Sequence, residues 1–189
     1  MVGSDPWLHT RAEVEALEKA GLTVRCVANA LDAIWDDRPE APKGAMTPYP
    51  IEFAGTSSDE KRAQIAATLS EAGQKAAVLT LPDSICWLLN VRGSDIERNP
   101  LAQCLGILHD TGTFTLFAAA EKTAGVMDHL GPDVTVRPME AFEPALRTLT
   151  GPVRVDKTTA PHGVGTALDE AGIAVAGDRD PCVMPNERN

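Results

Sequence analysis

Hydrophobic and polar positions along this chain change between helical and strand spacing. In residues 58–72, Ile65 and Leu69 share one face of a predicted helix that Gly73 ends. A continuous apolar run at 75–80 predicts a buried strand, and helical and strand patterns then alternate from residue 120 to residue 175. This alternation is typical of an α/β domain.

Two apolar runs interrupt the alternation with a different connection. Residues 101–108 and 113–117 are joined by a short polar segment that contains Gly112, a pattern that predicts an antiparallel hairpin. We therefore expect a mixed, mostly parallel sheet of about five or six strands with one antiparallel hairpin, flanked by helices.

The first forty residues predict a smaller unit. Thr10 and Glu13 form a capping box at the start of a helix that Gly21 ends, a strand follows at 22–27, and a second short helix is expected at 29–36. Prolines then recur, which predicts an extended, semi-rigid connector without regular helix or central strand; they are Pro39, Pro42, Pro48 and Pro50.

The segment 83–100, DSICWLLNVRGSDIERNP, combines a short apolar helix with a polar loop. Asp83 is a predicted cap for the helix start and Asn90 its end, while Gly93 is free to take a positive φ. One interpretation is that Arg92 and Asp95 pair across the glycine turn and hold the loop in shape.

Composition narrows the classes of partner. With 189 residues, 43% of them hydrophobic, and a formal net charge of −10, the chain predicts a globular domain that binds neither nucleic acid nor an anionic membrane. No apolar run approaches the roughly 20 residues that span a bilayer, and the N-terminus does not resemble a signal peptide. We therefore expect no membrane partner and a cytoplasmic location.

The residue types that carry chemistry are scattered. The four histidines and four cysteines lack the spacing of a metal site, so we expect no metal ligands and buried free thiols; they are His9, His109, His129, His162, Cys26, Cys86, Cys104 and Cys182. The run Gly163-Val164-Gly165 lacks the third glycine of a dinucleotide-binding fingerprint. The sequence thus predicts no catalytic, cofactor-binding or metal-binding residue.

Four segments carry a resemblance to a known family. The segment 83–100, the run DAIWDDRP at 32–39, FAGTS at 53–57 and DPCVMP at 180–185 resemble, in the same order, segments of the three-domain Xaa-Pro aminopeptidases (aminopeptidase P) of the creatinase/prolidase family. The resemblance implies that 1–38 is the remnant of a preceding domain, 39–57 a proline-rich linker, 58–181 a creatinase N-terminal-like α/β domain and 182–189 the start of a connector to a catalytic domain.

The resemblance also implies a function. Members of this family cleave the N-terminal residue before proline with two divalent metal ions, expected to be manganese, whose two Asp, one His and two Glu ligands lie in a C-terminal catalytic domain. We expect this chain alone to be inactive. Its expected roles are to position the domains, to restrict access to the substrate cleft and to support oligomerisation, for which a homodimer is one possible form. Its expected partners are the catalytic domain of the same polypeptide and proline-containing peptides.

The polar loop at 92–100 has two possible roles. The family resemblance implies that the polar loop faces the substrate cleft or docks the catalytic domain, through Arg92, Ser94, Asp95 and Asn99. The alternative is a self-standing creatinase N-terminal-like module that binds a partner without any hydrolase activity.

Overall fold

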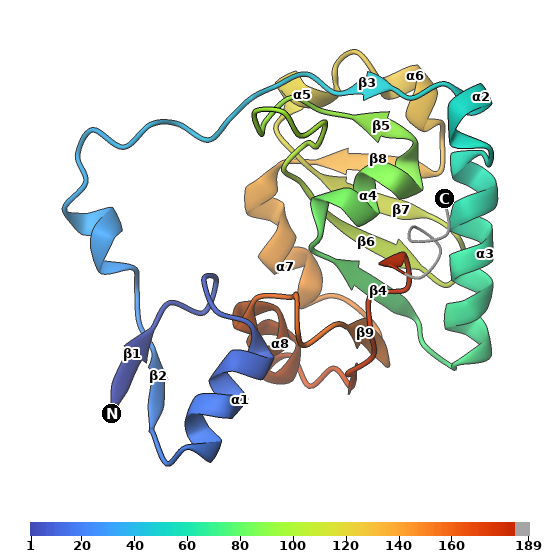
Figure 1. Ribbon diagram of the computed structural model, residues 1–189. Coiled ribbons are helices and arrows are strands. Elements are labelled where there is room, and N and C mark those ends of the chain that lie inside the picture. Colours follow the sequence, from blue (N-terminus) through green and yellow to red (C-terminus); the bar gives the residue numbers. More distant parts are fainter. Residues whose placement is uncertain (184–189) are drawn as a thin grey trace.

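A six-stranded sheet forms the centre of the computed structural model, which describes residues 1–183 (Figure 1). Its strand order is β10-β9-β4-β6-β7-β8. The strands are β4 (Ala76–Leu79), β6 (Leu105–His109), β7 (Phe114–Phe117), β8 (Val134–Arg137), β9 (Val153–Val155) and β10 (Val175–Ala176). Strand β6 is antiparallel to both of its neighbours, whereas the other neighbouring pairs are parallel, so the predicted mixed sheet with a hairpin is confirmed.

Helices cover both faces of this sheet. On one face, α3 (Ser58–Glu71) and α4 (Pro82–Leu89) pack Leu69 and Leu88 into one apolar core. On the other face, α7 (Phe142–Leu146) and α8 (His162–Glu170) contribute Phe142 and Val164 to a second core. Because β4 alternates its side chains between the two cores, all four of its residues are buried, as a continuous apolar run predicts.

Three predicted elements are shorter than the apolar pattern suggested. The strand expected at 101–108 begins only at β6, although Ala102 and Cys104 are still buried. The alternating pattern after residue 120 predicts helices at 120–130 and 139–149. The first divides into α5 (Ala120–Thr123) and α6 (Met127–Leu130), and the second consists of the 3-10 turn η2 (Met139–Ala141) followed by the short helix α7. Burial alone therefore does not distinguish a packed loop or turn from a regular element.

The N-terminal residues form a separate small unit beside α8 (Figure 1). Strand β1 (Val2–Ser4) pairs in parallel with β2 (Val24–Cys26), and α1 (Arg11–Lys19) connects them with the predicted Thr10 and Glu13 capping box. The helix expected at 29–36 is only the 3-10 turn η1 (Ala30–Ala33), and apolar side chains near it are exposed, namely Leu31, Ile34 and Trp35.

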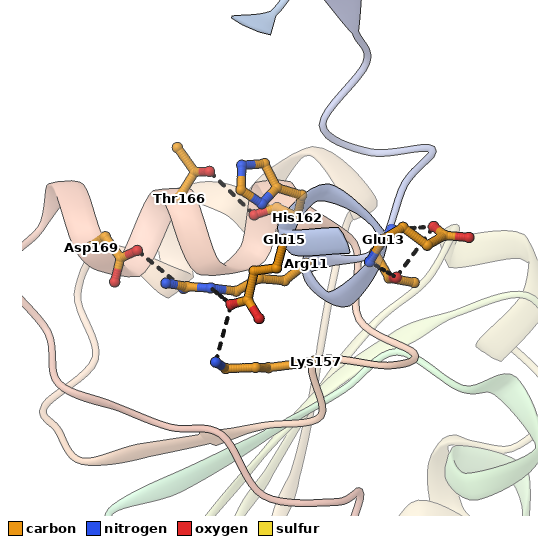
Figure 2. Close-up of polar contacts among 8 residues, drawn as sticks. Arg11, Glu13, Glu15, Lys157, His162, Thr166 and Asp169 are labelled. Carbon is orange, nitrogen blue, oxygen red and sulfur yellow. Dashed lines mark hydrogen bonds and ion pairs between the residues drawn. The ribbon is translucent and has the colours of Figure 1, made fainter. Parts of the chain in front are cut away.

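Polar contacts attach this N-terminal unit to α8 and to the segment that precedes it (Figure 2). Arg11 Nη1 lies 3.1 Å from an oxygen of Asp169, and Lys157 Nζ lies 3.1 Å from an oxygen of Glu15. A Cβ atom on Gly163 would lie 3.1 Å from the Trp7 ring, and one on Gly165 would lie 2.7 Å from Arg11. The two glycines thus allow the first turns of α8 to approach the N-terminal unit.

The connector is only partly extended. Residues 38–46 form no regular element, but β3 (Thr47–Pro48) pairs antiparallel with β5 (Val91–Arg92), and α2 (Ile51–Ala54) begins directly after Pro50. The expectation of a connector without regular helix was wrong for α2, because proline is tolerated directly before the first turn of a helix. Strand β3 belongs to a two-stranded sheet and is not the central strand that the expectation excluded. The chain of β3 is thereby fixed beside the polar loop.

Candidate functional site

The end of α4 sets the start of the polar loop. Asn90 adopts the left-handed conformation with φ 50° and ψ 51°, which confirms it as the residue that ends the helix. The prediction that Asp83 caps the start was wrong, since Leu81 occupies the N-cap position and Pro82 opens the helix. A proline at this point has a φ suited to the first turn and needs no cap partner for its missing N–H.

Gly93 is required by a close approach and does not have a positive φ. A Cβ atom at this position would lie 2.5 Å from the backbone nitrogen of Ala102. The Gly93 N–H donates to the Pro100 carbonyl at 3.0 Å, so a backbone hydrogen bond joins the start of the loop to its end. The loop is narrow because this glycine has no side chain.

The buried carboxylate of Asp95 fixes the conformation of the loop. Its carboxylate accepts hydrogen bonds from the Gln103 N–H at 2.6 Å and the Gly44 N–H at 2.9 Å, and it forms an ion pair with Lys122. The Asp95 side chain is fully buried and that of Lys122 is 5% exposed. The interpretation that Asp95 pairs with Arg92 was therefore wrong.

The electrostatics of Asp95 follow from these contacts. Burial raises the pKa of a carboxyl group, but the hydrogen bonds from Lys122, Gln103 and Gly44 outweigh burial here, so the pKa of Asp95 is lowered. Asp95 is therefore charged at neutral pH. Its carboxylate links the loop to the connector through Gly44 and to α5 through Lys122.

Arg92 lies on the outer side of the same loop. Its guanidinium carbon is 4.1 Å from the centre of the Tyr49 ring, a cation–π contact with the connector. Arg92 and Asn99 both line a pocket of about 400 Å³, whose remaining lining residues are Tyr49, Phe53, Ala54, Lys61, Asp83, Cys86, Trp87, Asn90, Val91, Pro100 and Leu101. Ser94 is exposed and its hydroxyl lies close to Gly44. The structure thus brings Arg92 and Asn99 together and places Ser94 and Asp95 elsewhere on the loop.

Lys61 is a pocket residue that the sequence analysis did not single out. It is 3% exposed, and its ammonium group donates to the Trp87 carbonyl at 2.9 Å and to Asn90 Oδ1 at 2.7 Å. Burial lowers its pKa. A signal was present, since Lys61 precedes Ile65 by four residues and Leu69 by eight and so falls on the buried face of α3.

The DPC run at 180–182 lies near the C-terminus and is bonded to Asp156, the residue after β9. The Asp180 N–H donates to Asp156 Oδ2 at 3.0 Å, and Asp180 Oδ1 accepts from the Cys182 N–H at 2.8 Å. Burial raises the pKa of both Asp180 and the Cys182 thiol. Residues 184–189 lie outside the described part of the chain; they include the last two residues of the DPCVMP segment and most of the connector expected at 182–189.

The cysteines and the other potential metal ligands are spread over the fold. All four cysteines are free, and three are buried as expected, but Cys26 is exposed at the edge strand β2. Within residues 1–183, no three His, Cys, Asp or Glu side chains gather in a way that could hold a metal ion. The described residues therefore do not fit a two-metal centre, and no catalytic step is assigned to them. No helix in this part of the chain is long and apolar enough to span a bilayer.

Comparison with known proteins gives a consistent assignment. The Creatinase/Prolidase N-terminal domain family matches residues 37–187. A probable Xaa-Pro aminopeptidase P of Coccidioides posadasii (strain RMSCC 757 / Silveira) is 34% identical over 156 residues, which are 79% of this chain and 26% of that protein. The corresponding protein of Ajellomyces dermatitidis is 37% identical over 145 residues, 73% of this chain and 23% of that protein.

A solved structure supports the same assignment over more of the chain. The X-prolyl aminopeptidase of Caenorhabditis elegans, described as a cytosolic enzyme with a dinuclear active site, is 25% identical with a TM-score of 0.78, and the match covers 94% of this chain and 31% of that protein. The chain spans about a quarter of the length of the two curated relatives. It belongs to the creatinase/prolidase N-terminal domain family.

Proposed function

We propose that this chain is the non-catalytic domain of a metal-dependent Xaa-Pro aminopeptidase, and that it acts together with a catalytic domain of the same polypeptide. Two comparisons support the proposal: curated relatives are named Xaa-Pro aminopeptidase P, and the C. elegans neighbour has a dinuclear active site. The metal ions, proposed to be manganese, would be held by the catalytic domain, where they would polarise the scissile carbonyl and activate water. By the same analogy the enzyme is proposed to be cytoplasmic.

The role that we propose is to position the catalytic domain and to wall the cleft that receives proline-containing peptides. The observation that carries it is the division of the polar loop: Asp95 is buried and holds the loop, which leaves Ser94 and Asn99 exposed and Arg92 at the pocket. A loop held so firmly presents its outer side chains in a fixed geometry, as docking and substrate positioning require. A homodimer is a further part of this proposal, with the exposed apolar side chains of Leu31, Ile34 and Trp35 as its contact surface.

The test uses a chimera in which this chain replaces the corresponding region of the C. elegans enzyme. In the chimera, Arg92→Ala is expected to lower kcat/KM for an Xaa-Pro peptide by about tenfold, equal to about 1.4 kcal/mol of lost transition-state stabilisation. Arg137→Ala, which removes an exposed arginine from β8, is the matched control and should leave kcat/KM unchanged. Equal kinetics of the two variants would contradict the role proposed for the loop.

A further inference from the structure

The pocket between α3, α4 and the polar loop contains a buried ammonium group without a carboxylate partner. Lys61 Nζ is held by two neutral oxygens, the Trp87 carbonyl and Asn90 Oδ1, and lies 4.3 Å from the centre of the Trp87 ring. Among residues 1–183, no Asp or Glu forms an ion pair with it. An ammonium group has three donors, so these two bonds leave one N–H for another acceptor. A buried charge is costly unless it is paired, and this one borders an open pocket.

A second cation lines the same pocket, and the Trp87 indole beside it has an unpartnered donor among the described residues. The Arg92 guanidinium stacks on Tyr49 and forms no ion pair with a carboxylate of the described residues. The indole Nε1–H of Trp87 is buried and has no acceptor in this part of the chain. Among the described residues that line the pocket, Asp83 is the one carboxylate, so Lys61, Arg92 and Asp83 together contribute a net charge near +1, although the whole chain carries −10.

The walls of the pocket are aromatic and apolar. Tyr49, Phe53 and Trp87 line it, and the Phe53 side chain is 68% exposed although it is large and apolar. A volume of about 400 Å³ lies in the range of small-molecule pockets, about 300–1,000 Å³, which combine apolar walls with a few placed polar groups. These walls fit a ring or an aliphatic side chain next to the charged group of a ligand.

We propose that this pocket binds the carboxylate of a small ligand with an apolar body, specifically the C-terminal residue of a short peptide. The carboxylate accepts hydrogen bonds from Lys61 and Arg92, and the apolar side chain packs against Tyr49, Phe53 and Trp87. A monoanion matches the net charge of the pocket near +1 better than a phosphate dianion does, and the planar guanidinium matches the two oxygens of a carboxylate. The inference goes beyond the proposed function, because it concerns binding by this chain alone.

Isothermal titration calorimetry on the full chain at pH 7 tests the site with N-acetyl-alanyl-phenylalanine and its C-terminal amide. We expect the acid to bind at least tenfold more tightly than the amide, since the amide lacks the charge that Lys61 and Arg92 bind. Lys61→Met should weaken binding of the acid at least tenfold. Lys75→Met removes the same charge from an exposed position paired with Asp110 and should change affinity less than twofold.

A second variant separates binding from folding. Lys61→Met leaves the buried Asn90 Oδ1 without the hydrogen bond that Lys61 donates to it, which can also affect folding. Arg92 is only partly buried and pairs with no described carboxylate. Arg92→Gln should therefore keep the native circular dichroism spectrum and still weaken binding of the acid at least fivefold. Equal affinity for acid and amide, or no saturable binding at millimolar concentration, would overturn the proposal. Binding of inorganic phosphate alone would overturn it as well, since it would indicate a simple anion site.

Discussion

The buried ion pair between Asp95 and Lys122 gives the sharpest prediction about stability. Asp95→Ala would leave the Lys122 ammonium buried at 5% exposure and remove the acceptor of the Gln103 and Gly44 N–H groups. Removing one partner of a buried pair costs about 3–5 kcal/mol, which is a large part of the roughly 5–15 kcal/mol that stabilises a typical domain. We therefore expect Asp95→Ala to lower the free energy of unfolding by about 4 kcal/mol.

Urea denaturation followed by circular dichroism measures this loss. The exposed pair of Lys75 and Asp110 is the control, and Lys75→Met should cost about 0–1 kcal/mol. The double variant Asp95→Ala/Lys122→Met should be less destabilised than the sum of the single variants by more than about 1 kcal/mol, because it buries no unpaired charge. A loss below about 1 kcal/mol in Asp95→Ala would refute the structural role given to this carboxylate.

The acid dependence of the same pair follows from the lowered pKa of Asp95. A folded pKa below the unfolded value means that the contribution to stability is present above about pH 4 and is lost as the pH falls through the folded value. The stability difference between the wild type and Asp95→Asn should therefore shrink in acid. A difference that stays constant down to pH 2 would argue against a charged Asp95.

Three further predictions concern the loop, the end of the sheet and the connector. Gly93→Ala should destabilise the chain by about 1–3 kcal/mol through overlap with the Ala102 backbone, whereas Gly125→Ala, whose Cβ would lie 3.8 Å from the nearest atom, should be close to neutral; urea denaturation compares them, and similar values would contradict the close approach. Asp180 has a raised pKa, so its contribution is present below the unfolded pKa and lost as the pH rises through the folded value; Asp180→Asn should therefore stabilise the chain relative to wild type at pH 7 more than at pH 4, and the reverse order in thermal melts would contradict this. Trypsin should cut first after Lys43, which is half exposed in the irregular connector, and mass spectrometry showing a first cut within 58–155 would contradict that placement.

Local signals in the sequence predicted much of the fold. The capping box at Thr10, the end of α4 at Asn90 and the buried strand β4 each depend on residues close together in the chain, and the structure confirms all three. The hairpin was predicted for the same reason, because a turn and two apolar runs define it.

The site was predicted less completely because its contacts are distant in sequence. Asp95 pairs with Lys122 across 27 positions, and its bond to Gly44 spans 51, so no local pattern could distinguish these partners from the nearby Arg92. The role of Gly93 likewise depends on where residue 102 returns to the loop. Lys61 could have been found, since a lysine in register with two buried apolar residues of a helix is an unusual feature.

An assay of Xaa-Pro cleavage by the purified chain tests most directly whether its function is non-catalytic. With manganese added, and with a native circular dichroism spectrum as the control for folding, we expect no release of the N-terminal residue from an Xaa-Pro peptide, whereas the chimera with the C. elegans catalytic domain should cleave it. Cleavage by the chain alone, abolished by a chelator, would contradict the claim that its function is non-catalytic.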